Sequence, residues 1–124
     1  MAHQLPRTVQ TILLGAAQII RNRGWCRGTL LDDRGAVCLL SAIFVASTGK
    51  PAASFYGEET HDPLTIAAWR VVEDLINDRY GGHGEGTQTI PGWNDQPART
   101  VEEVLQVLDD AVTVTDASYW PLSI

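Results

Sequence analysis

One apolar run constrains the fold of this chain more than any other feature of its sequence. Residues Ala36 to Ala46 contain a single polar residue, Ser41, and the run is about eleven residues long. That length is far short of the roughly twenty apolar residues that cross a bilayer. A helix without a polar face is buried rather than exposed on the surface of a globular protein. We therefore predict a buried central helix from Cys38 to Ser47, which ends at Thr48-Gly49-Lys50-Pro51.

Three further helices are predicted from apolar residues that recur at spacings of three and four. Each has a recognisable start or stop signal. The predicted ranges are 8–23, closed by Gly24; 62–80, opened by Asp62 at the N-cap and Pro63 at the first helical position; and 100–112, opened by a capping box of Thr100 and Glu103.

A short β-hairpin is predicted between the first helix and the central helix. Trp25 to Leu31 and Ala36 to Cys38 flank the turn Asp32-Asp33-Arg34-Gly35. A chain of 124 residues is long enough for one hydrophobic core but not for two. The predicted fold is therefore mainly α, a compact bundle of about four helices around a buried central helix, with a short β-hairpin after the first helix. We expect residues 1–124 to form a single helical domain.

The charge balance narrows the classes of partner. Nine Lys and Arg residues against fifteen Asp and Glu residues give a net charge of −6. Such a chain repels phosphate backbones and anionic lipids, so we expect neither a nucleic acid nor a membrane as its partner. The amino-terminal residues lack the pattern of a signal peptide, and two cysteines are too few for a disulfide framework. We expect a cytoplasmic protein with reduced thiols.

The cysteines and histidines admit two chemical interpretations that we weigh against simple packing. Cys38 with His61 or His83 has the residue types of a thiol-dependent enzyme, but Cys38 stands among apolar neighbours, which is typical of an inert buried thiol. A zinc site that also used Cys26 would lack the short ligand spacings of structural zinc sites. The run Gly81 to Gly86 contains four glycines but lacks the lysine and hydroxyl of a phosphate-binding loop. We therefore predict no metal, no cofactor and no catalytic residue, with Cys38, His61 and His83 as the alternative.

The most informative constellation is Trp93-Asn94-Asp95 together with Arg99, which lies outside any periodic pattern. In one interpretation, Trp93 fills the core, Asn94 and Asp95 form turns with the backbone, and Arg99 pairs with Asp95. In the other, these four residues form a binding site, since Trp and Arg are enriched at binding hot spots.

Three segments carry a resemblance to a known family. They are Arg23-Gly24-Trp25-Cys26-Arg27-Gly28, Gly35 to Ile43, and Ile90-Pro91-Gly92-Trp93-Asn94-Asp95-Gln96-Pro97-Ala98-Arg99-Thr100. Together they resemble an uncharacterised family of small actinobacterial and phage-encoded proteins, a domain of unknown function with a late Trp-Asn-Asp … Pro-x-Arg-Thr motif. Ser41 stands where that family usually has glycine. The resemblance implies an architecture and an origin but no activity.

Two function classes remain open at this point. The first is a small acidic accessory or regulatory protein that binds another protein and is not an enzyme, with Trp93, Asn94, Asp95 and Arg99 as the predicted binding residues. The alternative is a thiol-dependent hydrolase or transferase that uses Cys38. The reactivity of the thiols in the folded protein would discriminate between them.

Overall fold

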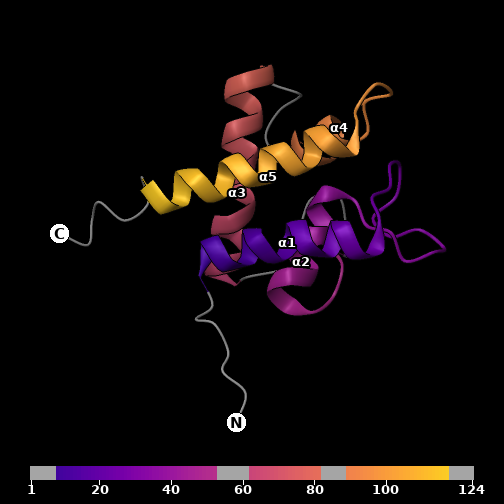
Figure 1. The fold of residues 1–124 in the computed structure, drawn as a ribbon, viewed down its shortest axis with the longest axis horizontal. Coiled ribbons are helices and arrows are strands. Elements are labelled where there is room, and N and C mark those ends of the chain that lie inside the picture. The colour runs from indigo at the N-terminus through magenta and orange to yellow at the C-terminus, as the bar shows by residue number, and fades with distance from the viewer. Residues whose placement is uncertain (1–7, 53–61, 82–88, 118–124) are drawn as a thin grey trace, which may run out of the picture.

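The computed structural model describes residues 8–52, 62–81 and 89–117, and these residues are mainly helical. The helices are α1 (Val9–Arg23), α2 (Leu39–Thr48), α3 (Pro63–Tyr80), α4 (Thr89–Asn94) and α5 (Val101–Ala117). α1 and α5 run side by side in opposite directions, and α3 crosses them steeply (Figure 1). α2 packs on α1 and α3. The prediction of a mainly α chain is confirmed for the described residues.

The helices begin where local capping signals place them. Thr8 caps α1, and its side chain accepts a hydrogen bond from the backbone N–H of Thr11. Asp62 caps α3 in the same way, and Pro63 occupies the first turn. At the start of α5, Thr100 Oγ1 accepts from the Glu103 N–H at 3.2 Å, while Glu103 Oε1 accepts from the Thr100 N–H at 3.0 Å. The predicted helix starts are therefore confirmed.

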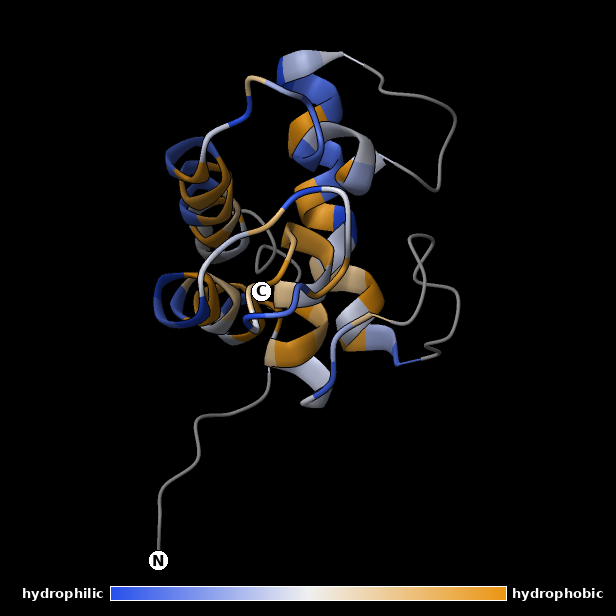
Figure 2. Cartoon of the chain, turned by 90° about the vertical axis from the view of Figure 1, so that its right-hand side faces the viewer, coloured by the Kyte–Doolittle hydropathy of each residue, from blue (hydrophilic) through white to orange (hydrophobic). Residues whose placement is uncertain are grey.

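Most of the apolar run forms α2, and its residues from Ala36 to Phe44 are buried. Cys38 caps this helix, Gly49 ends it in the left-handed conformation, and all six residues from Leu39 to Phe44 are buried. The apolar sides of the helices turn toward one another, whereas their polar sides face outward (Figure 2). One cluster of buried apolar residues draws members from all five helices. Burial of this surface from water is the main force that holds the helices together.

The predicted β-hairpin is wrong. Val37 forms two isolated bridges, a parallel one with Trp25 and an antiparallel one with Leu31, and no ladder extends beyond them. Gly28 has a φ of 79° and reverses the chain inside the expected first strand. The carboxylate of Asp32 accepts hydrogen bonds from the backbone N–H groups of Arg34 and Ala36, both at 2.9 Å, and closes a tight turn. The side chain of Asp32 thus stabilises this turn, which in a hairpin would be stabilised by hydrogen bonds between two strands.

The sequence patterns also missed α4. Its six residues, Thr89 to Asn94, are too few to show helical periodicity, and they include Pro91 and Gly92. Proline is tolerated here because it lies in the first turn, where its missing N–H would have no intrahelical partner. Trp93 and Asn94 therefore lie on a helix, whereas the sequence analysis placed them outside any periodic element.

Candidate functional site

Asn94 is the centre of a polar junction between segments that are far apart in the sequence. Its side chain is fully buried. Its Oδ1 accepts hydrogen bonds from the indole Nε1 of Trp25 at 2.7 Å and from the backbone N–H of Leu39 at 3.0 Å. Its Nδ2 donates to the carbonyl of Cys26 at 3.1 Å and to Oδ1 of Asp95 at 2.9 Å. Because Leu39 is the first residue of α2, Asn94 also satisfies an N–H that has no partner within that helix.

Arg27 and Asp95 extend this junction to the surface. Nη1 of Arg27 donates to the backbone carbonyls of Gln96 (3.1 Å), Pro97 (2.6 Å) and Arg99 (3.4 Å). In return, Oδ1 of Asp95 accepts from the backbone N–H of Gly28 at 2.9 Å. We call residues 25–28 and 94–99 together the loop junction. It joins the three segments that carry the family resemblance.

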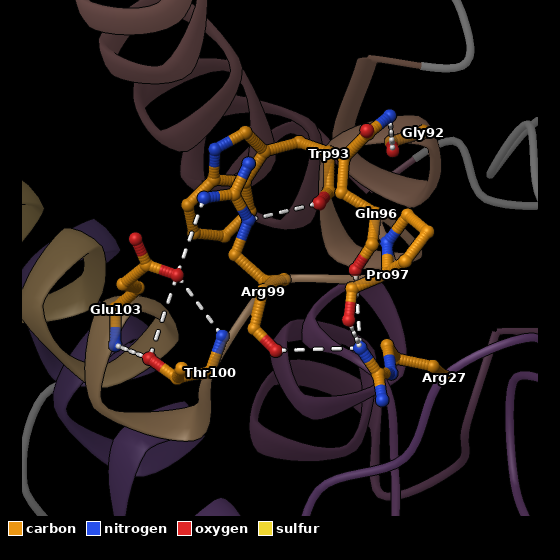
Figure 3. A network of polar contacts seen from close by, with 8 residues as sticks. All are labelled: Arg27, Gly92, Trp93, Gln96, Pro97, Arg99, Thr100 and Glu103. Atoms are coloured by element: carbon orange, nitrogen blue, oxygen red, sulfur yellow. Dashed lines mark hydrogen bonds and ion pairs between the residues drawn. The ribbon is translucent and has the colours of Figure 1, made fainter.

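Arg99 is enclosed by aromatic rings rather than paired with Asp95. Its guanidinium carbon lies 3.9 Å from the ring centre of Trp93 and 4.9 Å from that of Tyr80. Nε donates to the Trp93 carbonyl at 3.0 Å, and Nη1 lies 3.3 Å from Oε1 of Glu103 (Figure 3). The predicted Arg99–Asp95 pair is wrong, because Asp95 turns toward Gly28 and Asn94 instead. Hydrogen bonding to the Thr100 N–H, and then the charge of Arg99, lower the pKa of Glu103.

Trp93 is a core residue by every geometric measure. It is fully buried, and its ring packs against Tyr80 with the ring centres 5.3 Å apart. Its indole N–H is also buried and has no hydrogen-bond partner within the described part of the chain. This placement agrees with the packing interpretation of the Trp93 to Arg99 constellation. A direct role of these four residues in binding stays a prediction, with only Asp95 and Arg99 partly exposed.

The two thiols are free and buried. Burial raises the pKa of Cys38, which serves as the N-cap of α2 and accepts a hydrogen bond from the Ser41 N–H at 3.4 Å. Burial and, next, the charge of Cys38 raise the pKa of Cys26 to about 11. Its Sγ donates to the Ala36 carbonyl at 3.4 Å. Since the thiolate is the nucleophile, thiols held protonated in this way react slowly.

The structure gives no support to the remaining catalytic and metal-binding candidates in the residues that it describes. His61 and His83, proposed as partners of Cys38, lie outside the described residues. Among residues 8–52, 62–81 and 89–117, no group of three or more His, Cys, Asp or Glu side chains is placed to hold a metal ion. Within the same ranges, no helix combines the length and the apolar character needed to span a bilayer.

Sequence reasoning missed the two residues that hold the loop junction from the α1 side, Trp25 and Arg27. A signal was present, since both lie in the short segment between Gly24 and Gly28, where a large aromatic and an arginine stand outside any helix. That signal could not name their partners, which lie 69 or more residues further along the chain.

Comparison with known proteins places the chain in a family without assigning an activity. No curated protein and no solved structure matches it. The model of one family, described as Family of unknown function (DUF6197), matches residues 4–114. The match covers most of the chain and all three segments that carry the resemblance. This chain therefore belongs to the Family of unknown function DUF6197.

Proposed function

We propose that this protein is a small accessory or regulatory protein that acts by binding another protein and catalyses no reaction. The observation that carries the proposal is that residues 96–98 are exposed while hydrogen bonds within the loop junction hold their backbone in place. Gln96, Pro97 and Ala98 are exposed, yet the backbone beneath them is fixed by three hydrogen bonds from Arg27. Loops that a rigid scaffold holds in place are where binding residues concentrate.

Rigidity matters because association must overcome the entropy lost when a loop becomes ordered. A loop already fixed in the free protein avoids much of that cost, and the gain appears as affinity. Asn94, a buried residue of the junction, and its neighbour Trp93 support such a surface from within the core. Asp95 and Arg99 stand at its edge, both partly buried and each held by contacts within the chain.

Exposed side chains in the stretch of chain around and after residues 25–28 also suit a protein partner. Leu31, in the neighbouring loop, is one of three large apolar side chains that stay exposed in the described ranges, with 41% of its surface accessible. Arg27 and Arg34 are exposed on the same stretch of chain. Apolar and arginine side chains together are typical of binding hot spots. The burial and raised pKa of Cys38 give no comparable support to a thiol-dependent hydrolase or transferase.

The origin and location of the protein are part of the same proposal. The resemblance of the three segments supports an actinobacterial or phage origin. The acidic balance and the reduced thiols support a cytoplasmic location.

Affinity capture with a matched pair of variants tests the proposal. Ala98→Arg places a bulky cation on the exposed loop, and Gln106→Arg adds the same charge to the exposed side of α5. We expect the wild type and Gln106→Arg to capture the same protein from a lysate of the source organism. Ala98→Arg should capture at least about tenfold less, a loss of about 1.4 kcal/mol, with an unchanged melting temperature. Equal capture by both variants would remove the loop junction as the binding surface.

A further inference from the structure

A second surface, formed by α3 and α5, has its own chemistry. α3 and α5 cross, and a hollow of about 340 Å³ opens where they diverge. The hollow is lined by Val71, Asp74, Leu75, Asp78 and Val114. Its size is at the lower end of the range for protein pockets, so it has room for a few side chains rather than for a large molecule.

The sequence of α3 places two kinds of side chain along this hollow. Val71 and Leu75 are four residues apart, and so are Asp74 and Asp78. Residues at this spacing are neighbours on one face of a helix. The result is an apolar row beside a row of two carboxylates, and Val114 of α5 completes the apolar side.

The two carboxylates form no ion pair in the described part of the chain, although Arg70 lies one turn before Asp74 on α3. Asp74 and Asp78 are both exposed. The neighbouring arginine, Arg79, is committed to Asp110 on α5, and this contact lowers the pKa of Asp110. Like charges one helical turn apart repel each other, so a cation bound between them would relieve that repulsion.

We propose that the α3–α5 hollow binds a basic amphipathic helix of a partner protein. Apolar side chains of that helix enter the hollow, and two Lys or Arg side chains one turn apart meet the carboxylates of Asp74 and Asp78. Recognition of an amphipathic helix by an apolar groove between helices is a common binding mode. Charge complementarity selects a basic helix and rejects phosphate-bearing ligands.

Another hollow of comparable size does not share this pattern. It lies between α1 and α5 and is lined by Arg21, Glu102, Leu105, Gln106 and Asp109. It presents both signs of charge and a single large apolar side chain. The α3–α5 hollow therefore has the more specific chemistry of the two.

A designed peptide tests the proposal with a defined probe. The probe is a fluorescent helix of Leu and Lys, about 18 residues or five turns long, and its twin carries Glu in place of Lys. Binding is followed by fluorescence anisotropy. We expect the Lys peptide to bind saturably and the Glu peptide not to bind. The double variant Asp74→Asn/Asp78→Asn should weaken binding at least about tenfold.

Matched controls separate the hollow from the overall negative charge. The double variant Asp33→Asn/Asp109→Asn removes the same charge from two exposed positions outside the hollow. We expect it to bind the Lys peptide within about twofold of the wild type at physiological salt. Val114→Thr keeps the shape of the side chain but adds a hydroxyl to the apolar side, and should weaken binding severalfold.

The outcomes that overturn the proposal are distinct. Equal losses in the two double variants would mean that the peptide responds to net charge alone, and retained binding in Asp74→Asn/Asp78→Asn would remove the hollow as the site. Self-association of the wild type that Asp74→Asn/Asp78→Asn abolishes would make the occupant a second copy of this chain. Ala98→Arg should bind the peptide like the wild type. The peptide therefore tests the α3–α5 hollow alone, and the capture experiment tests the loop junction alone, so that either proposal can fail without the other.

Discussion

Replacement of Asn94 by Ala should destabilise the fold by about 3–5 kcal/mol. The substitution removes four hydrogen bonds at once and leaves two buried backbone groups without a partner, the N–H of Leu39 and the carbonyl of Cys26. Each buried group left unpaired costs about 1–3 kcal/mol. The indole N–H of Trp25 adds less, because that side chain is only half buried and water can reach it.

Urea denaturation followed by circular dichroism measures this loss. The midpoint should fall while the dependence of the free energy on urea stays unchanged, as expected when a substitution alters stability alone. Asn77→Ala is the matched control, because Asn77 is exposed on α3 and its side chain makes no hydrogen bond to a described residue. We expect its effect to stay within about 0.5 kcal/mol.

Asn94→Leu separates lost hydrogen bonds from lost volume. Leucine is close in size to asparagine but cannot pair with the buried N–H and carbonyl. We expect Asn94→Leu to be about as unstable as Asn94→Ala. The reasoning is refuted if Asn94→Ala loses less than about 1 kcal/mol, or if Asn94→Leu regains most of the stability.

Three further predictions concern the core, a helix cap and the thiols. Trp93→Ala should cost about 3–5 kcal/mol in urea unfolding. Trp93→Phe should cost clearly less, because it removes an indole N–H that has no partner in the described chain. Thr100→Ala should cost about 0.5–2 kcal/mol by loss of the cap of α5, and an unchanged midpoint would contradict the capping geometry. Folding raises the pKa of Cys26 from 9.0 to about 11, so the folded chain keeps a proton that the unfolded chain releases. Stability should therefore be full below pH 9 and fall as the pH rises toward 11. Urea midpoints across this window should fall less for Cys26→Ala, and parallel curves would contradict the raised pKa.

The sequence by itself determined where the long helices begin and how deep α2 lies. A cap involves residues three positions apart, as at Asp62 with Thr65 and at Thr100 with Glu103, so its signal is complete within a few letters of sequence. The burial of α2 can also be predicted from the sequence, because a helix with no polar face is not stable at the surface in water. These features need no knowledge of the rest of the chain.

The contacts of the loop junction and the lining of the α3–α5 hollow depend on the tertiary structure and could not be predicted from the sequence. The carbonyls that Arg27 binds lie 69 to 72 residues along the chain, and Asn94 reaches Trp25 across 69 residues. Arg99 could pair locally with Asp95, yet it stacks on Trp93 and Tyr80, because Asp95 already accepts from Gly28. The hydrogen-bond partners of these polar groups come within reach only in the folded chain, so no local sequence pattern identifies them. The physical reason is the short range of the hydrogen bond, which acts over about 3 Å and so depends on the final packing of the helices.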